Sequence, residues 1–90
     1  MGFRKLKGVR IPEEEQGFIR YTCLTYGTQT KEVCEKIDRL CAECGGEYSD
    51  ALKEVMCSRR SIYQIGLKYH VSERTIYRIR KKFYESWRSP

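Results

Sequence analysis

The sequence predicts an all-α domain, a compact bundle of about five helices. Apolar residues recur at helical spacing in at least four segments, and no segment shows the alternating pattern of a strand. Only two Pro and seven Gly interrupt the 90 residues, a composition that favours helices over turns and sheets. A chain of this length is expected to form one domain with one modest core and no roomy catalytic cleft.

The first helix is expected to begin at Pro12, because Pro suits a first helical turn. Three carboxylates follow at Glu13–Glu15, where they favour the positive end of the helix dipole. We expect Gly27 to end this helix. Its buried stripe would contain Phe18, Ile19, Thr22, Cys23 and Tyr26.

The second helix is predicted to start after Thr28 or Thr30 and to end at Gly45 and Gly46. Ser49 is expected to cap a short third helix. The second helix would bury Val33, Cys34, Ile37, Leu40, Cys41 and Cys44, and the third Leu52, Val55 and Met56.

The last third of the chain predicts two helices joined by a short turn. Ser61 and Gln64 have the spacing of a capping box, which opens the fourth helix. Ser72 is expected to cap the fifth helix, over 72–86. The inner face of the fourth helix would hold Ile62, Ile65, Gly66 and Tyr69, and that of the fifth Ile76, Ile79, Phe83 and Trp87.

This spacing is typical of a helix-turn-helix. Two helices that cross after so short a turn need a small residue where they touch, and Gly66 supplies it. Val71, in the turn, would fill the space between the two helices with an apolar side chain. We expect His70, at a turn position that Gly often fills, to adopt the left-handed conformation at a small cost.

The pI of 9.2 and the net charge of +6 suggest a polyanionic partner. The charge is distributed unevenly and divides the chain into three parts. Residues 1–10 form a basic arm of net charge +4, residues 11–57 an acidic helical scaffold of −5, and residues 58–90 a basic region of +7. The arm is expected to be mobile. It would follow the phosphate backbone or the minor groove of DNA, or act as a merely solubilising terminus.

The basic region predicts a DNA-binding surface on the fifth helix. Side chains at the start of such a helix reach base edges in the major groove, and flanking basic residues contact phosphates. Tyr63, Tyr77 and Tyr84 are expected to pack in the core or to stack at this interface. The predicted DNA-binding residues are Ser72, Glu73, Arg74, Tyr77, Arg78, Lys81, Lys82, Arg59 and Arg60.

The stretch from Ser61 to Trp87, SIYQIGLKYHVSERTIYRIRKKFYESW, resembles the DNA-binding region of the sigma-factor region-four type. It is also similar to small helix-turn-helix transcriptional regulators of phages and prophages, including late-operon activators. The resemblance covers about a third of the chain. It implies binding at a promoter with contact to RNA polymerase, and DNA reading by Arg74, Tyr77, Arg78 and Lys81.

These observations predict a sequence-specific regulator of transcription that binds double-stranded DNA and is encoded by a phage or prophage. A DNA-packaging or recombination component is the alternative, and a protein-interaction domain for an acidic partner is a third class. Because one such motif covers one half-site, tight binding would need a homodimer or RNA polymerase. We expect a cytoplasmic, nucleoid-associated protein without a membrane segment or an enzymatic activity.

The five cysteines are expected to be reduced core residues, and no metal or other cofactor is predicted. Cys41 and Cys44 form one knuckle-like pair, with Cys34, Cys57 and His70 as further candidate ligands for zinc. A second pair is lacking, and Cys34, Cys41 and Cys44 fall on an apolar stripe, where a thiol acts as a small hydrophobe. Cys41 and Cys44 also close a helix, whereas reactive dithiols usually open one.

Overall fold

The computed structural model describes Leu6 and residues 8–88, and these form an all-helical molecule without a strand. The core occupies the space between the helices, and single short connections join neighbouring helices. The all-α prediction is confirmed. The five α-helices are α1 (Glu13–Leu24), α2 (Lys31–Gly45), α3 (Ser49–Cys57), α4 (Ile62–Tyr69) and α5 (Glu73–Ser86), with 3-10 turns η1 (Tyr26–Thr28) and η2 (Gly46–Tyr48).

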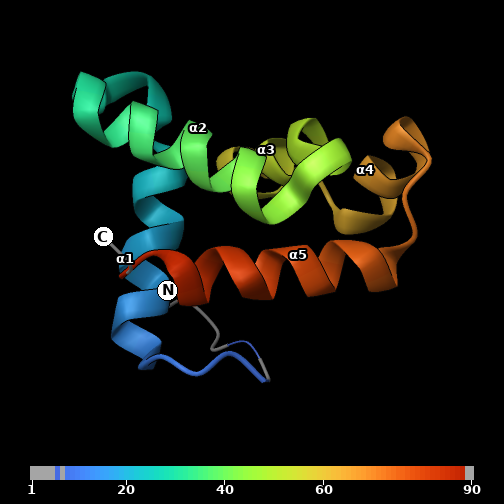
Figure 1. Cartoon of the computed structure of the whole chain (residues 1–90), viewed down its shortest axis with the longest axis horizontal. Coiled ribbons are helices and arrows are strands. Elements are labelled where there is room, and N and C mark those ends of the chain that lie inside the picture. Colours follow the sequence, from blue (N-terminus) through green and yellow to red (C-terminus); the bar gives the residue numbers. More distant parts are fainter. Residues whose placement is uncertain (1–5, 7, 89–90) are drawn as a thin grey trace.

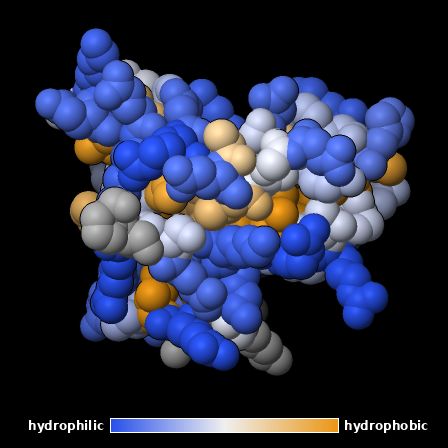
Figure 2. All heavy atoms as spheres, in the orientation of Figure 1, coloured by the Kyte–Doolittle hydropathy of each residue, from blue (hydrophilic) through white to orange (hydrophobic). Residues whose placement is uncertain are grey.

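The helices pack in two layers with α1 across one end (Figure 1). α2 and α3 lie on one side of α5, α4 lies beside its N-terminal end, and α1 crosses near its C-terminal end. In the space-filling view, hydrophobic atoms show mainly in the middle of this face, and hydrophilic side chains cover its rim (Figure 2). The largest fully buried side chains are Tyr84, Phe83, Ile19, Ile37, Leu52, Met56, Ile65, Ile76, Ile79, Gln16 and Cys23.

Some predicted helix ends and buried positions differ in the structure. α1 ends at Leu24 rather than Gly27, because the chain tightens into η1. Ser49 is the first residue of α3 and gives no side-chain cap, since η2 leads directly into that helix. Phe18 was expected in the core but is 61% exposed, because the buried face of α1 is formed by Gln16, Ile19, Thr22 and Cys23.

The described part of the N-terminal segment packs against the bundle, which differs from the free arm expected for residues 1–10. Val9 and Ile11 are buried in the core. The backbone N–H of Leu6 donates to Oε1 of the buried Gln16 at 2.9 Å, and Gln16 Nε2 donates to the Ile11 carbonyl at 3.0 Å. The N–H of Arg10 donates to a Glu85 carboxylate oxygen at 3.2 Å. Residues 1–5 and 7 lie outside the described residues.

Arg20 joins α1 to the C-terminal end of α3. Its guanidinium donates to the carbonyls of Val55, Met56 and Ser58, the last two at 2.9 and 3.0 Å. The final carbonyls of a helix have no partner within the helix. Arg20 therefore supplies these groups with donors and fixes α3, against which both α4 and α5 pack.

Candidate nucleic-acid interface

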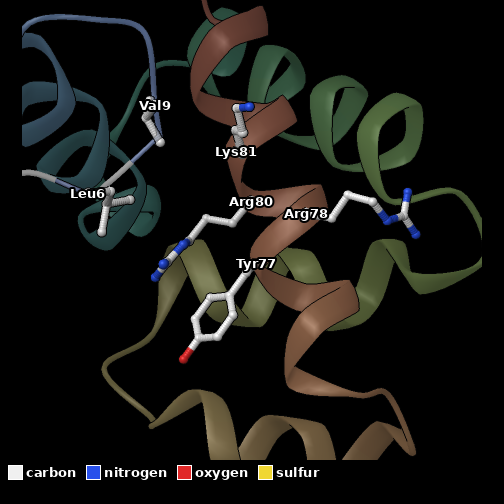
Figure 3. Close-up of a pocket in the computed structure, with 6 residues that line it drawn as sticks. All are labelled: Leu6, Val9, Tyr77, Arg78, Arg80 and Lys81. Atoms are coloured by element: carbon white, nitrogen blue, oxygen red, sulfur yellow. The ribbon is translucent and has the colours of Figure 1, made fainter.

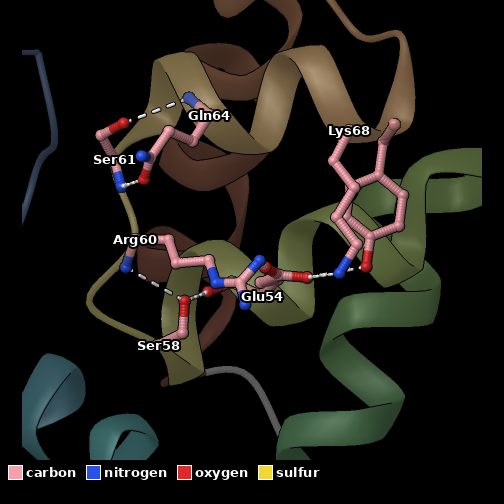
Figure 4. A network of polar contacts seen from close by, with 7 residues as sticks. Glu54, Ser58, Arg60, Ser61, Gln64 and Lys68 are labelled. Carbon is pink, nitrogen blue, oxygen red and sulfur yellow. Dashed lines mark hydrogen bonds and ion pairs between the residues drawn. The ribbon is translucent and has the colours of Figure 1, made fainter.

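Local capping bonds fix the ends of α4 and α5 around the turn between them. The Ser61 hydroxyl accepts a hydrogen bond from the Gln64 N–H at 3.1 Å, and the Gln64 side chain accepts one from the Ser61 N–H, completing the predicted capping box (Figure 4). Ser72 Oγ accepts from the Thr75 N–H at 3.1 Å, as predicted for the cap of α5. His70 has φ 57° and ψ 45°, which is the left-handed conformation expected there.

α4 and the turn approach each other at Gly66. The Gly66 carbonyl accepts the Val71 N–H at 3.0 Å, and a Cβ at Gly66 would lie 2.7 Å from the Val71 carbonyl oxygen. No larger residue fits without movement of the backbone. Ile65, Val71, Ile76 and Ile79 are buried around this point and Tyr69 is partly buried, so the predicted packing between the two helices is confirmed.

The predicted residues of α5 lie together on its exposed side. Four of them are cations, and none of these is within ion-pair distance of an acidic residue in the described part of the chain. Tyr77 is 48% exposed, and its hydroxyl lies 3.5 Å from Glu73 Oε1, at the limit of a hydrogen bond. The exposed cations are Arg74, Arg78, Lys81 and Lys82, which we call the basic face of α5.

Arg59 and Arg60 lie before α4 and are exposed, but Arg60 is engaged elsewhere. Its guanidinium pairs with Glu54 on α3 at 3.4 Å. Glu54 also accepts hydrogen bonds from Tyr69 Oη at 2.7 Å and Lys68 Nζ at 3.0 Å (Figure 4). The structure therefore places Arg60 at the contact between α3 and α4 and apart from the basic face of α5.

Two tyrosines named with the predicted interface differ in their surroundings. Tyr84 is 1% exposed, and burial raises the pKa of its hydroxyl to about 12. It packs edge-on against Phe83, with ring centroids 6.5 Å apart, so it belongs to the core and is closed to a ligand. Its position eight residues after the buried Ile76, two steps of i+4, is the sequence signal for burial. Tyr63 is 63% exposed on α4.

One residue missing from the predicted interface is Arg80. It lines a pocket of about 530 Å³ between the N-terminal segment and α5, together with Leu6, Val9, Tyr77, Arg78 and Lys81 (Figure 3). Its guanidinium lies over the Tyr77 ring, 5.2 Å from the centroid. The contact with the N-terminal segment joins residues about 70 positions apart, and helical periodicity carries no signal for it.

Four of the cysteines belong to the core region: Cys23, Cys41 and Cys44 are buried there, and Cys57 packs against it beside Cys23. Cys41 and Cys44 are buried on α2 as expected, and burial raises the pKa of the Cys41 thiol to about 12. Cys34 Sγ donates to the Tyr26 carbonyl at 3.3 Å. Over Leu6 and residues 8–88, no three His, Cys, Asp or Glu side chains come together as a metal site, and each cysteine is a free thiol.

Comparison with known proteins identifies no relative of this chain. No protein-family model, curated protein or solved structure matches this chain. Among the described residues, every helix is too short or too polar to span a bilayer.

Proposed function

We propose that this protein binds double-stranded DNA sequence-specifically and regulates transcription, with α4 and α5 acting as a helix-turn-helix. The basic face of α5 carries this proposal. Arg74, Arg78, Lys81 and Lys82 are exposed on one helix and have no ion-pair partner in the described chain. Exposed cations without an ion-pair partner favour a polyanion, whose bound counterions are released when the two associate.

The fixed entry into α5 supports a role in reading bases. Ser72 caps the helix and Gly66 allows the close turn before it, so the first turns of α5 project from a rigid support. In the major groove, Arg74, Tyr77 and Arg78 would face base edges. Lys81 and Lys82 lie further along the helix and would contact phosphates.

One such unit contacts only one half-site, which limits its affinity. A second copy of the chain or RNA polymerase, bound next to it, would supply the remaining binding energy. Selection of bound sequences from random duplexes separates these two partners. A palindromic product indicates a homodimer, and a single half-site indicates a monomer or a polymerase-assisted reader.

The proposal is tested by comparing Arg78→Ala with Lys82→Ala. We expect Arg78→Ala to cost about 1–3 kcal/mol at the preferred site and to relax sequence choice at one position. Lys82→Ala should weaken binding to all sequences alike and lower the salt slope by about one. The measurement is a titration of specific and scrambled duplexes at several salt concentrations, with circular dichroism as the control for folding.

A folded Arg78→Ala variant that binds both duplexes as tightly as wild type would show that α5 is not the reading helix. Failure of the wild-type protein to bind either duplex at low salt would reject DNA binding itself.

A further inference from the structure

Arg80 is a partly buried cation whose charge has no partner in the described chain. No acidic side chain lies within ion-pair distance of it, and it makes no hydrogen bond with the described residues. Its guanidinium lies over the face of the Tyr77 ring. Burial lowers the pKa of the guanidinium, yet an arginine remains charged at neutral pH.

The pocket beside α5 leaves this charge open to a ligand. Removing a cation from water is costly unless another group compensates it. No side-chain nitrogen or oxygen of the described residues is fully enclosed without a partner, so the Arg80 nitrogens still reach solvent, and Arg80 lines the pocket. In Figure 3 its guanidinium extends towards Leu6, whereas Arg78 leaves α5 in the opposite direction.

We propose that this pocket holds one sugar-phosphate unit of the bound duplex, with the phosphate on Arg80. The inference rests on the proposed DNA binding and adds a second contact surface, which the N-terminal segment forms beside α5. Leu6 and Val9 supply apolar contacts beside the cations, which suit the hydrophobic side of a deoxyribose. A free phosphate ion would use the cations and leave these apolar contacts unused.

Arg78 and Arg80 extend in different directions and would therefore have different roles. Arg78 belongs to the face that would enter the groove, and Arg80 points to the side where the N-terminal segment lies (Figure 3). Because the segment is tied to Gln16 and Glu85, the pocket exists before DNA arrives. A preformed wall costs little ordering entropy on binding. The phosphate contact would therefore set how α5 is positioned along the groove, without reading sequence.

The test compares Arg80→Met with Arg39→Met. Methionine keeps an apolar stem against Tyr77 and removes the charge. Arg39 lies on α2 and is exposed, where it pairs with Glu43 at 3.9 Å, so its variant removes the same charge from another surface. We expect Arg80→Met to weaken the specific and the scrambled duplex equally, by about fivefold, and to lower the salt slope by about one. Arg80→Lys should restore the slope.

Other outcomes have distinct meanings. If folded Arg80→Met binds duplex as well as Arg39→Met does, the pocket proposal fails and the reading role of α5 stands. If wild type binds no duplex, both proposals fail. A parallel titration with inorganic phosphate completes the test. Loss of phosphate binding in Arg80→Met with unchanged duplex affinity would assign the pocket to a soluble phosphate and overturn the inference.

Discussion

Gly66 sets how closely α4 and the turn that follows it can pack. Its carbonyl accepts the Val71 N–H, and the space that a Cβ would need is occupied by the Val71 carbonyl oxygen. Glycine normally weakens a helix by about 1 kcal/mol relative to alanine. Here this cost is offset, because the close approach lets the buried Val71 and Ile76 pack around Gly66. The direction of α5 thus depends on the absence of one methyl group.

Gly66→Ala should destabilise the protein by about 1–2 kcal/mol, because overpacking outweighs the gain in helix propensity. The measurement is urea unfolding followed by circular dichroism. Gly27→Ala is the matched control, since a Cβ there meets nothing within 4 Å and should change stability by less than about 0.5 kcal/mol. Equal stability of both variants would mean that the chain adjusts at Gly66 without cost.

At the scale of elements, Glu54 links α3 to α4. Its carboxylate accepts from Tyr69 and Lys68 on α4 and pairs with Arg60 before that helix. The hydrogen bonds from Tyr69 and Lys68 lower the pKa of Glu54. Since the partner cations are more than half exposed, water screens each ion pair and its contribution to stability is small.

The lowered pKa makes this link sensitive to acid. A carboxyl whose pKa is lower in the folded state stabilises it above the unfolded value of about 4.3, and this contribution is lost as the pH falls through the folded pKa. We expect Glu54→Gln to be less stable than wild type at pH 6, with the difference shrinking towards pH 3. Urea unfolding across this range measures it.

The control for this prediction is Glu47→Gln, at an exposed residue of η2 that makes no ion pair within the described chain. It should follow the wild-type pH profile. If Glu54→Gln also follows that profile, the link between α3 and α4 does not depend on the Glu54 charge.

The same scale explains what could be predicted from the sequence. The capping residues Ser61 and Ser72, and the left-handed turn at His70, depend on neighbours within a few positions. The Arg20 bonds to α3 and the pocket at Arg80 join segments far apart in the chain. No local pattern encodes such contacts. The outward-facing residues of α5 follow from helical periodicity, whereas the wall formed by the N-terminal segment does not.

At the scale of the whole molecule, α2 connects the acidic part of the chain to α5. The basic face of α5 is exposed, and α2 packs against that helix (Figure 1). Lys36 of α2 lies over the Trp87 ring, 4.1 Å from its centroid, so the start of α2 is held near the end of α5. Glu32 and Glu35 are exposed on this part of α2. Because their negative charges would repel phosphates, we propose that DNA approaches from the side opposite to them.

The double variant Glu32→Lys and Glu35→Lys tests this orientation. It removes two negative charges and adds two positive ones, a net change of +4 in the acidic part, which would strengthen binding greatly if that surface met phosphates. On the far side of the molecule, most of the field is screened beyond the Debye length of about 8 Å at physiological salt. We expect duplex affinity to be unchanged or slightly raised, with the salt slope of the wild type. The measurement is a salt-dependent titration of a folded variant.

A steeper salt slope in the double variant would place α2 against the duplex and reverse the proposed orientation. A large loss of affinity in a folded variant would contradict it as well, because it would show that these glutamates contact the duplex. Lys81→Glu and Lys82→Glu supply the matched comparison, since they reverse two charges on the basic face of α5. They should reduce affinity for both specific and scrambled duplexes, because a change of charge of equal size and opposite sign now falls where phosphates are expected to lie.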